Sequence, residues 1–149
     1  MTKHNHGFTL IELIVVILIL GILAAVAAPR FVNLTSEARI AALNGLRASV
    51  SSAAALTNAL QVARGLGTGA SVTVEGFVVT MVNAYPQGAV GGIDNAIQMD
   101  ATTYSTSVAA PVYTFMIRGG TAPNCQFQYT AAAAAGSAPT ISTAVTTGC

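Results

Sequence analysis

The chain has 149 residues, of which 53% are hydrophobic and only 7% carry a charge, and its mean hydropathy is +0.65. A soluble monomer normally has about 25% charged residues, so this surface is either covered by partners or made polar by Ser, Thr, Asn and Gln. The chain has no basic cluster, which argues against a nucleic-acid-binding surface.

The first predicted element is an apolar helix from Phe8 to Ala28, in which Glu12 is the single charged residue. Such a helix is about 31 Å long, which matches the hydrocarbon core of a bilayer. It fits a permanent anchor, a secretory signal cut near residues 25–27, or a helix that leaves the membrane to assemble elsewhere. Glu12 argues against the cut signal, because a carboxylate costs about 2.5–3.5 kcal/mol inside a membrane helix.

The helical pattern continues beyond this segment, which is a second argument against a cut there. Pro29 should kink the helix, because proline lacks an N–H and crowds the preceding turn. An apolar stripe then predicts an amphipathic half-helix, ending at Arg64-Gly65 with a basic last turn and a C′ glycine. The stripe consists of Leu43, Leu46, Val50, Ala53, Leu56 and Leu60.

Residues 65–149 change to short β-rich segments. "SVTV" and "FVVTMV" on either side of Glu75-Gly76 predict a hairpin, "NAYPQGAVGG" a loop, and "IDNAIQM" one helical turn capped by Asp94. "VYTFMI", "CQFQYT" and "PTISTAV" predict strands, with Cys125, Phe127 and Tyr129 on one face. We expect an α+β fold in which an antiparallel sheet of about four strands covers the apolar stripe.

Cys125 and Cys149 are the two cysteines of the chain. An even count in an exported chain indicates a disulfide, and the alternative is a pair of unpaired buried thiols. Neither their spacing nor the histidines indicate a metal site. Asp94 and Asp100 lack the dense oxygen ligands that calcium requires, so we expect capping and loop roles for them.

No catalytic constellation is apparent. After Gly7 the chain has no histidine or lysine that could activate a nucleophile. "GLGTG" lacks the lysine of a phosphate-binding loop and follows a helix instead of preceding one. We therefore expect neither enzymatic activity nor a cofactor.

The segment "GFTLIEL" resembles the processing site of type IV pilins and type II secretion pseudopilins. The resemblance implies that residues 1–7 are a leader, that prepilin peptidase cuts between Gly7 and Phe8, and that the same enzyme N-methylates Phe8. It implies that Glu12 and Pro29 correspond to the family's conserved glutamate and helix-kinking proline. It also implies a helical spine, a small sheet and a disulfide-bounded C-terminal loop. Within the family, "VTMVNAYP" and "CQFQYT…TTGC" look most like mannose-sensitive haemagglutinin (MSHA) pilins.

Glu12 then has a physical explanation. Cleavage would create an α-ammonium group at Phe8, and a buried carboxylate is tolerated when it is paired with a cation. If the next subunit places its amine beside Glu12, the pair fixes the register of assembly. Pairing of Glu12 with its own N-terminus, one helical turn away, is the alternative, and the sequence leaves both open.

We therefore expect a structural subunit that waits in the inner membrane and is then assembled by the pilus machinery. The product would be a helical homo-oligomeric filament on the bacterial surface, used for attachment. Residues 8–28 would form the transmembrane and filament-core half of the helix, residues 29–64 its amphipathic half, and residues 65–149 the head.

Two alternatives are a type II secretion pseudopilin and a minor pilin that binds DNA or another ligand. The size of the C-terminal loop and the missing acidic calcium cluster argue against the first. The second requires a basic or aromatic patch, and the head after residue 64 has only Arg118.

Overall fold

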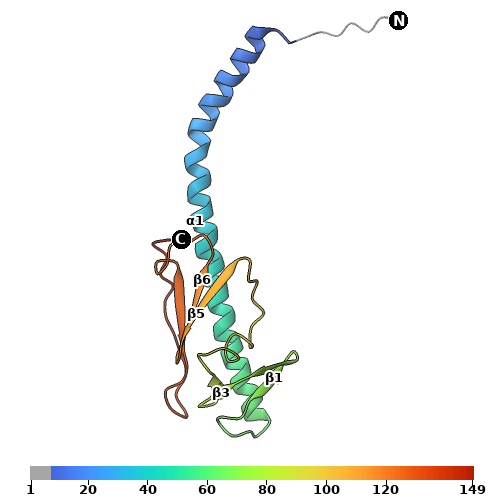
Figure 1. Ribbon diagram of the computed structural model, residues 1–149, viewed down its shortest axis with the longest axis vertical. Coiled ribbons are helices and arrows are strands. Elements are labelled where there is room, and N and C mark those ends of the chain that lie inside the picture. Colours follow the sequence, from blue (N-terminus) through green and yellow to red (C-terminus); the bar gives the residue numbers. More distant parts are fainter. Residues whose placement is uncertain (1–7) are drawn as a thin grey trace, which may run out of the picture. The chain divides into compact units, whose positions relative to one another are not determined.

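The computed structural model describes residues 8–149, and the side chains of all of these except residues 30–33. One helix, α1 (Leu10–Ala63), is followed by eight short strands (Figure 1). The chain divides into two compact units, with the boundary between Glu37 and Ala38. The second unit, residues 38–149, contains the remainder of α1 and every strand, and from here on the name head refers to this whole unit and not only to residues 65–149. The expected α+β architecture is confirmed.

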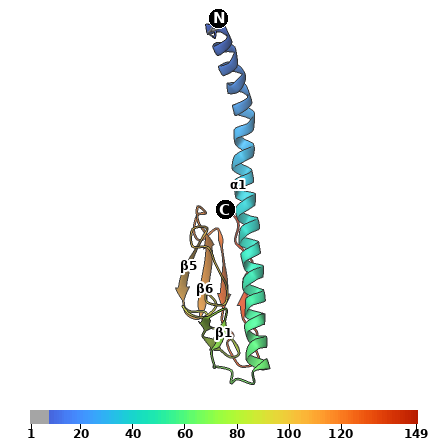
Figure 2. The same cartoon turned by 90° about the vertical axis from the view of Figure 1, so that its right-hand side faces the viewer.

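The head is built on one face of α1, and Figure 2 shows the strands beside this part of the helix. The predicted burial of the second half of the apolar stripe is wrong, because Leu56 is 54% exposed and Leu60 is only half-buried. A straight helix has 3.6 residues per turn, and the hydrophobic residues after Val50 drift away from the face that this period defines. Among the side chains of α1 that the structure describes, the buried ones are Leu43, Leu46, Val50, Ala54, Thr57 and Gln61.

The two buried polar residues are accommodated by hydrogen bonds to backbone oxygens. The Thr57 hydroxyl donates to the Ala53 carbonyl at 2.9 Å. The Gln61 amide nitrogen donates to the carbonyls of Gly67 and Ala70, at 2.9 and 2.7 Å. The Thr57 hydroxyl and the Gln61 amide nitrogen are therefore paired within the core, and Gln61 also fixes the loop that follows the helix. The buried Gln61 amide oxygen has no hydrogen-bond partner among the described residues.

The C-terminal end of α1 is a Schellman motif. The Leu66 N–H donates to the Gln61 carbonyl at 3.1 Å, and the Gly65 N–H donates to the Val62 carbonyl at 3.0 Å. Gly65 has a φ of +63°, a left-handed conformation that glycine adopts without a steric penalty. The expected C′ glycine is confirmed, but α1 ends at Ala63, before Arg64, so the expected basic last turn is wrong.

The main sheet has the strand order β5-β6-β7-β8 and is antiparallel throughout. Alternation in β7 buries Phe127 and Tyr129, and Cys125 just before the strand is buried too, as the sequence predicts. The aromatic rings of Phe115 and Phe127, which are paired across β6 and β7, stack with centroids 5.0 Å apart. This aromatic face packs against the buried side of α1. The strands are β5 (Tyr104–Ala109), β6 (Val112–Ile117), β7 (Gln126–Thr130) and β8 (Thr140–Ile141).

Two smaller hairpins precede this sheet. The predicted hairpin around Glu75-Gly76 is confirmed, and both turn residues have positive φ, as a two-residue type I′ turn requires. The segment "FVVTMV" is not one strand, however, because it divides at Thr80. The strands are β1 (Val72–Val74), β2 (Phe77–Val79), β3 (Met81–Val82) and β4 (Tyr85–Pro86).

Three other local predictions were wrong. The segment predicted as a loop contributes β4, and residues 93–99 form turns followed by irregular chain instead of a helical turn. In those turns Asp94 accepts a hydrogen bond from the Gly91 N–H at 3.2 Å and caps no helix. Strand β5 was missed because its sequence, "YSTSVA", is polar and lies at the edge of the sheet, where little burial is required.

Tyr129 joins the main sheet to the second hairpin. It is fully buried, and its hydroxyl donates to the Pro86 carbonyl at 2.7 Å. We expect Tyr129→Phe to destabilise the head by about 1–3 kcal/mol, because the buried carbonyl loses its partner. Urea unfolding of the detergent-solubilised chain measures this. Tyr104→Phe is the control and should cost less, because the Tyr104 hydroxyl makes a longer, 3.3 Å bond.

Alkaline pH should also destabilise the head through Tyr129. Burial raises the pKa of Tyr129 above its ordinary value of 10.0, so folding favours the neutral phenol. The stability that this group provides is complete below pH 10 and is lost as the pH rises beyond that value.

Candidate processing and assembly segment

The first part of α1 is apolar on all sides. Its large hydrophobic side chains between Leu10 and Val26 are each 46–75% exposed. By length and composition, α1 could cross a membrane. Its most apolar stretch lies near the N-terminus, and none of the residues in this stretch is buried by the rest of the chain. A helix that is hydrophobic all round is stable only when lipid or other protein surrounds it.

The N-terminus of α1 is closed by a capping box between Thr9 and Glu12. Glu12 Oε2 accepts hydrogen bonds from the Thr9 N–H at 2.9 Å and from the Thr9 hydroxyl at 2.8 Å. The Glu12 N–H donates to the Thr9 hydroxyl oxygen at 3.3 Å. These bonds satisfy backbone donors that have no partner within the helix.

Sequence analysis missed this role, although its signal was present. Threonine followed by glutamate three residues later, at the start of an apolar run, is the pattern of a capping box. Glu12 thus has a local structural role in addition to any role in assembly. Any test of Glu12 has to separate the two.

The other expected site residues of this segment lie as follows. Gly7 is outside the described residues. Phe8 is 87% exposed and lies at the same end of the helix as Glu12. Pro29 lies inside α1 and cannot donate the helical hydrogen bond to the Ala25 carbonyl, because its nitrogen carries no hydrogen.

At the head, Cys125 and Cys149 form a disulfide, with their Cα atoms 4.9 Å apart. Two arginines of α1 bind the segment that leads to Cys149. Arg39 Nη1 donates to the Cys149 backbone oxygen at 2.9 Å, and Arg47 Nε donates to the Ser142 carbonyl at 2.7 Å. Arg39 and Arg47 therefore hold residues 142–149 against the helix.

The acidic residues of the head are used in turns. Asp100 accepts hydrogen bonds from Thr102 and Thr103, including two hydroxyl bonds of 2.6 Å. These bonds lower the pKa of Asp100 to about 2. Within residues 8–149, no group of three or more His, Cys, Asp or Glu side chains could hold a metal ion.

Comparison with known proteins agrees with this geometry. Residues 2–28 match the family model described as the prokaryotic N-terminal methylation motif. The chain is 39% identical over 115 residues to the type IV narrow pilus major component PilA5 of Thermus thermophilus. That alignment covers 76% of this chain and 88% of the relative. No solved structure matches the chain significantly. A long apolar N-terminal helix with its methylation motif, a small antiparallel head and a relative of nearly the same extent together show that the chain belongs to the type IV pilin family.

Proposed function

We propose that this chain is the precursor of a pilus subunit that is cut between Gly7 and Phe8, methylated at Phe8 and assembled through α1 into a filament. The observation that carries the proposal is the match of residues 2–28 to the N-terminal methylation motif. The motif leads directly into a helix whose large apolar side chains are all about half exposed or more. Such a surface requires an apolar environment that the head does not supply.

Two environments fit this helix. Burial of apolar surface contributes about 25 cal/mol per Å², so the helix is stable in a bilayer or among copies of itself and unfavourable in water. A direct transfer from the inner membrane into a filament core keeps the surface away from water throughout. This supports prepilin peptidase and the inner-membrane assembly machinery as partners.

We further propose that the chain is a major subunit and that its filament serves in surface attachment. The name of the Thermus relative, a major pilus component, supports the first part. The resemblance of "VTMVNAYP" and "CQFQYT…TTGC" to MSHA pilins supports the second.

The mass of the mature chain tests this proposal. We expect filaments sheared from cells to contain a chain that lacks residues 1–7 and carries one additional methyl group at Phe8. Intact-mass and N-terminal peptide measurements detect both changes. Cells without the prepilin peptidase are the control and should retain the uncut chain. A mature chain that starts at Ala28 or Pro29 would contradict the proposal.

A further inference from the structure

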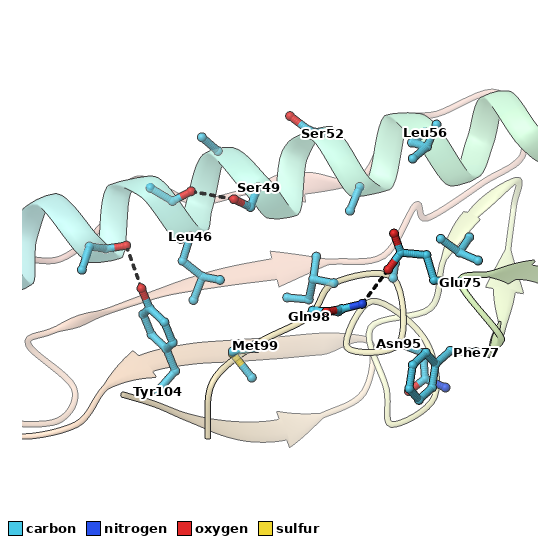
Figure 3. A pocket seen from close by; sticks show the side chains of 17 residues that line it. Leu46, Ser49, Ser52, Leu56, Glu75, Phe77, Asn95, Gln98, Met99 and Tyr104 are labelled. Atoms are coloured by element: carbon cyan, nitrogen blue, oxygen red, sulfur yellow. Dashed lines mark hydrogen bonds between the residues drawn. The ribbon is translucent and has the colours of Figure 1, made fainter. Parts of the chain in front are cut away.

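The head carries an open groove of about 930 Å³ between α1 and the residues that face it (Figure 3). One wall is the exposed face of α1 from Ala42 to Leu56. The other is formed by the β1–β2 hairpin, residues 95–99 and Tyr104. Leu56 and Phe77 line the groove and are 54% and 55% exposed, so apolar surface in it is accessible.

Gly45 in the helical wall has no explanation within the head. Glycine inside a helix is less stable than alanine because it loses more backbone freedom on folding. A Cβ atom at Gly45 would meet nothing within 4 Å, so no neighbour in the described chain requires its absence. At Gly88 and Gly92 the reason is visible, since a Cβ there would collide with backbone atoms. Gly67 and Gly69 also meet nothing within 4 Å, but they lie in the loop after α1 and not inside a helix. Gly45 thus points to close approach by a group outside this chain.

The charges of the head indicate what that group is. Glu75 lies on the groove wall, where it accepts a 2.6 Å hydrogen bond from Gln98, and no basic residue lines the groove. Arg39 and Arg47 are bound to backbone oxygens of residues 142–149, and Arg118 donates to the carbonyls of Ala101 and Tyr104.

Arg64 is the remaining arginine of the head. Its side chain is exposed and makes no hydrogen bond or ion pair with the described residues. It lies at the end of α1 between two exposed apolar residues, Val62 (68% exposed) and Leu66 (40%). The residues around Arg64 thus form an apolar projection with a positive charge. The groove is an apolar depression with a negative charge.

We propose that the groove receives the Val62–Leu66 turn of a second copy of this chain, with Arg64 of that copy beside Glu75 and its backbone close to Gly45. This contact rests on the proposed filament function. Because the groove and the turn are different surfaces of one chain, the contact is heterologous: each copy offers its turn to one neighbour and its groove to another. Such contacts continue from copy to copy and build open helical assemblies, whereas a self-complementary patch closes a dimer.

Charge reversal tests the contact in the full chain expressed in pilus-forming cells. Arg64→Glu and Glu75→Arg should each lower the yield of sheared filaments at least about tenfold, because each places like charges together. The double variant should restore the yield to within about twofold of wild type, and it also shows that neither change prevents folding. Wild-type yield from a single variant, or no restoration in the double variant, would overturn the contact.

Gly45→Leu provides an independent test of the groove. A Cβ at Gly45 would meet nothing within 4 Å, and leucine favours a helix more than glycine does, so the melting temperature of the head should be unchanged or higher while the filament yield falls. Asn44→Leu is the matched control, because Asn44 is the adjacent exposed residue of α1 and does not line the groove. Equal yields from the two variants would refute the groove. If wild-type cells form filaments and the variants form as many, only this contact is refuted. If wild-type cells form no filaments, the proposed function itself is refuted.

Discussion

Replacing Glu12 with leucine should abolish filaments while leaving normal amounts of the precursor in the inner membrane. The carboxylate costs about 2.5–3.5 kcal/mol inside a bilayer, so the leucine variant should insert at least as well as wild type. In a filament, the same change would remove the carboxylate that we propose as the partner of the Phe8 ammonium group. Breaking a buried ion pair costs about 3–5 kcal/mol, which opposes assembly at every subunit. Membrane fractions and sheared-filament yields from the same cells measure both quantities.

The capping box makes a sharper comparison possible. Glu12→Gln keeps a side chain that can cap the Thr9 N–H but removes the charge. Thr9→Val removes the capping hydroxyl, at a cost of about 1 kcal/mol, and keeps the charge. If the charge is the determinant, Glu12→Gln should assemble as poorly as Glu12→Leu, and Thr9→Val should still form filaments. The reverse order would show that Glu12 acts through the cap, and our explanation of its charge would be wrong.

Removal of the disulfide should have the largest effect on the head. Cys125 and Cys149 are 24 positions apart, and closing a loop of this length contributes about 3.5 kcal/mol on the chain-entropy model. We expect the Cys125→Ala/Cys149→Ala variant to lose about this amount, a large fraction of the 5–15 kcal/mol typical of a folded domain. Urea unfolding of the full chain in detergent, followed by circular dichroism, gives the difference.

Reduction supplies the control for this variant. Wild-type chain unfolded in the presence of a reductant should match the double alanine variant, which itself should not respond to the reductant. Arg39→Gln removes the hydrogen bond to Cys149 but leaves the disulfide, so its effect should be smaller. Unfolding curves of wild-type chain that coincide with and without reductant would contradict the prediction.

Helix α1 and the central strands β6 and β7 could be predicted from sequence because one strong pattern specifies each of them. The end of α1 at Gly65 and the alternation of β7 follow directly from helix-capping chemistry and strand geometry. The buried positions Thr57 and Gln61 could not be predicted. Their burial depends on the carbonyls of Ala53, Gly67 and Ala70, and side-chain hydrophobicity contains no information about these groups.

In the candidate site, too, the local features could be predicted and the long-range contacts could not. The processing motif is local, so "GFTLIEL" identifies it without a structure. The roles of Arg39 and Arg47 depend on residues that follow them by 110 and 95 positions, and no local pattern indicates such contacts. The groove likewise combines Gly45 with Glu75 and Gln98, which only the folded head brings to one place.

The arginine contacts also impose an order on biosynthesis. A ribosome produces Arg39 and Arg47 long before Ser142 and Cys149, so the helix is complete while its hydrogen-bond acceptors in the chain do not yet exist. Strand β8, both arginine contacts and the disulfide all depend on residues 140–149. A chain cut short before Thr140 would leave β7 as an unpaired edge with Cys125 as a free thiol. Proteases that degrade unfolded chains could therefore distinguish truncated from full-length translation products.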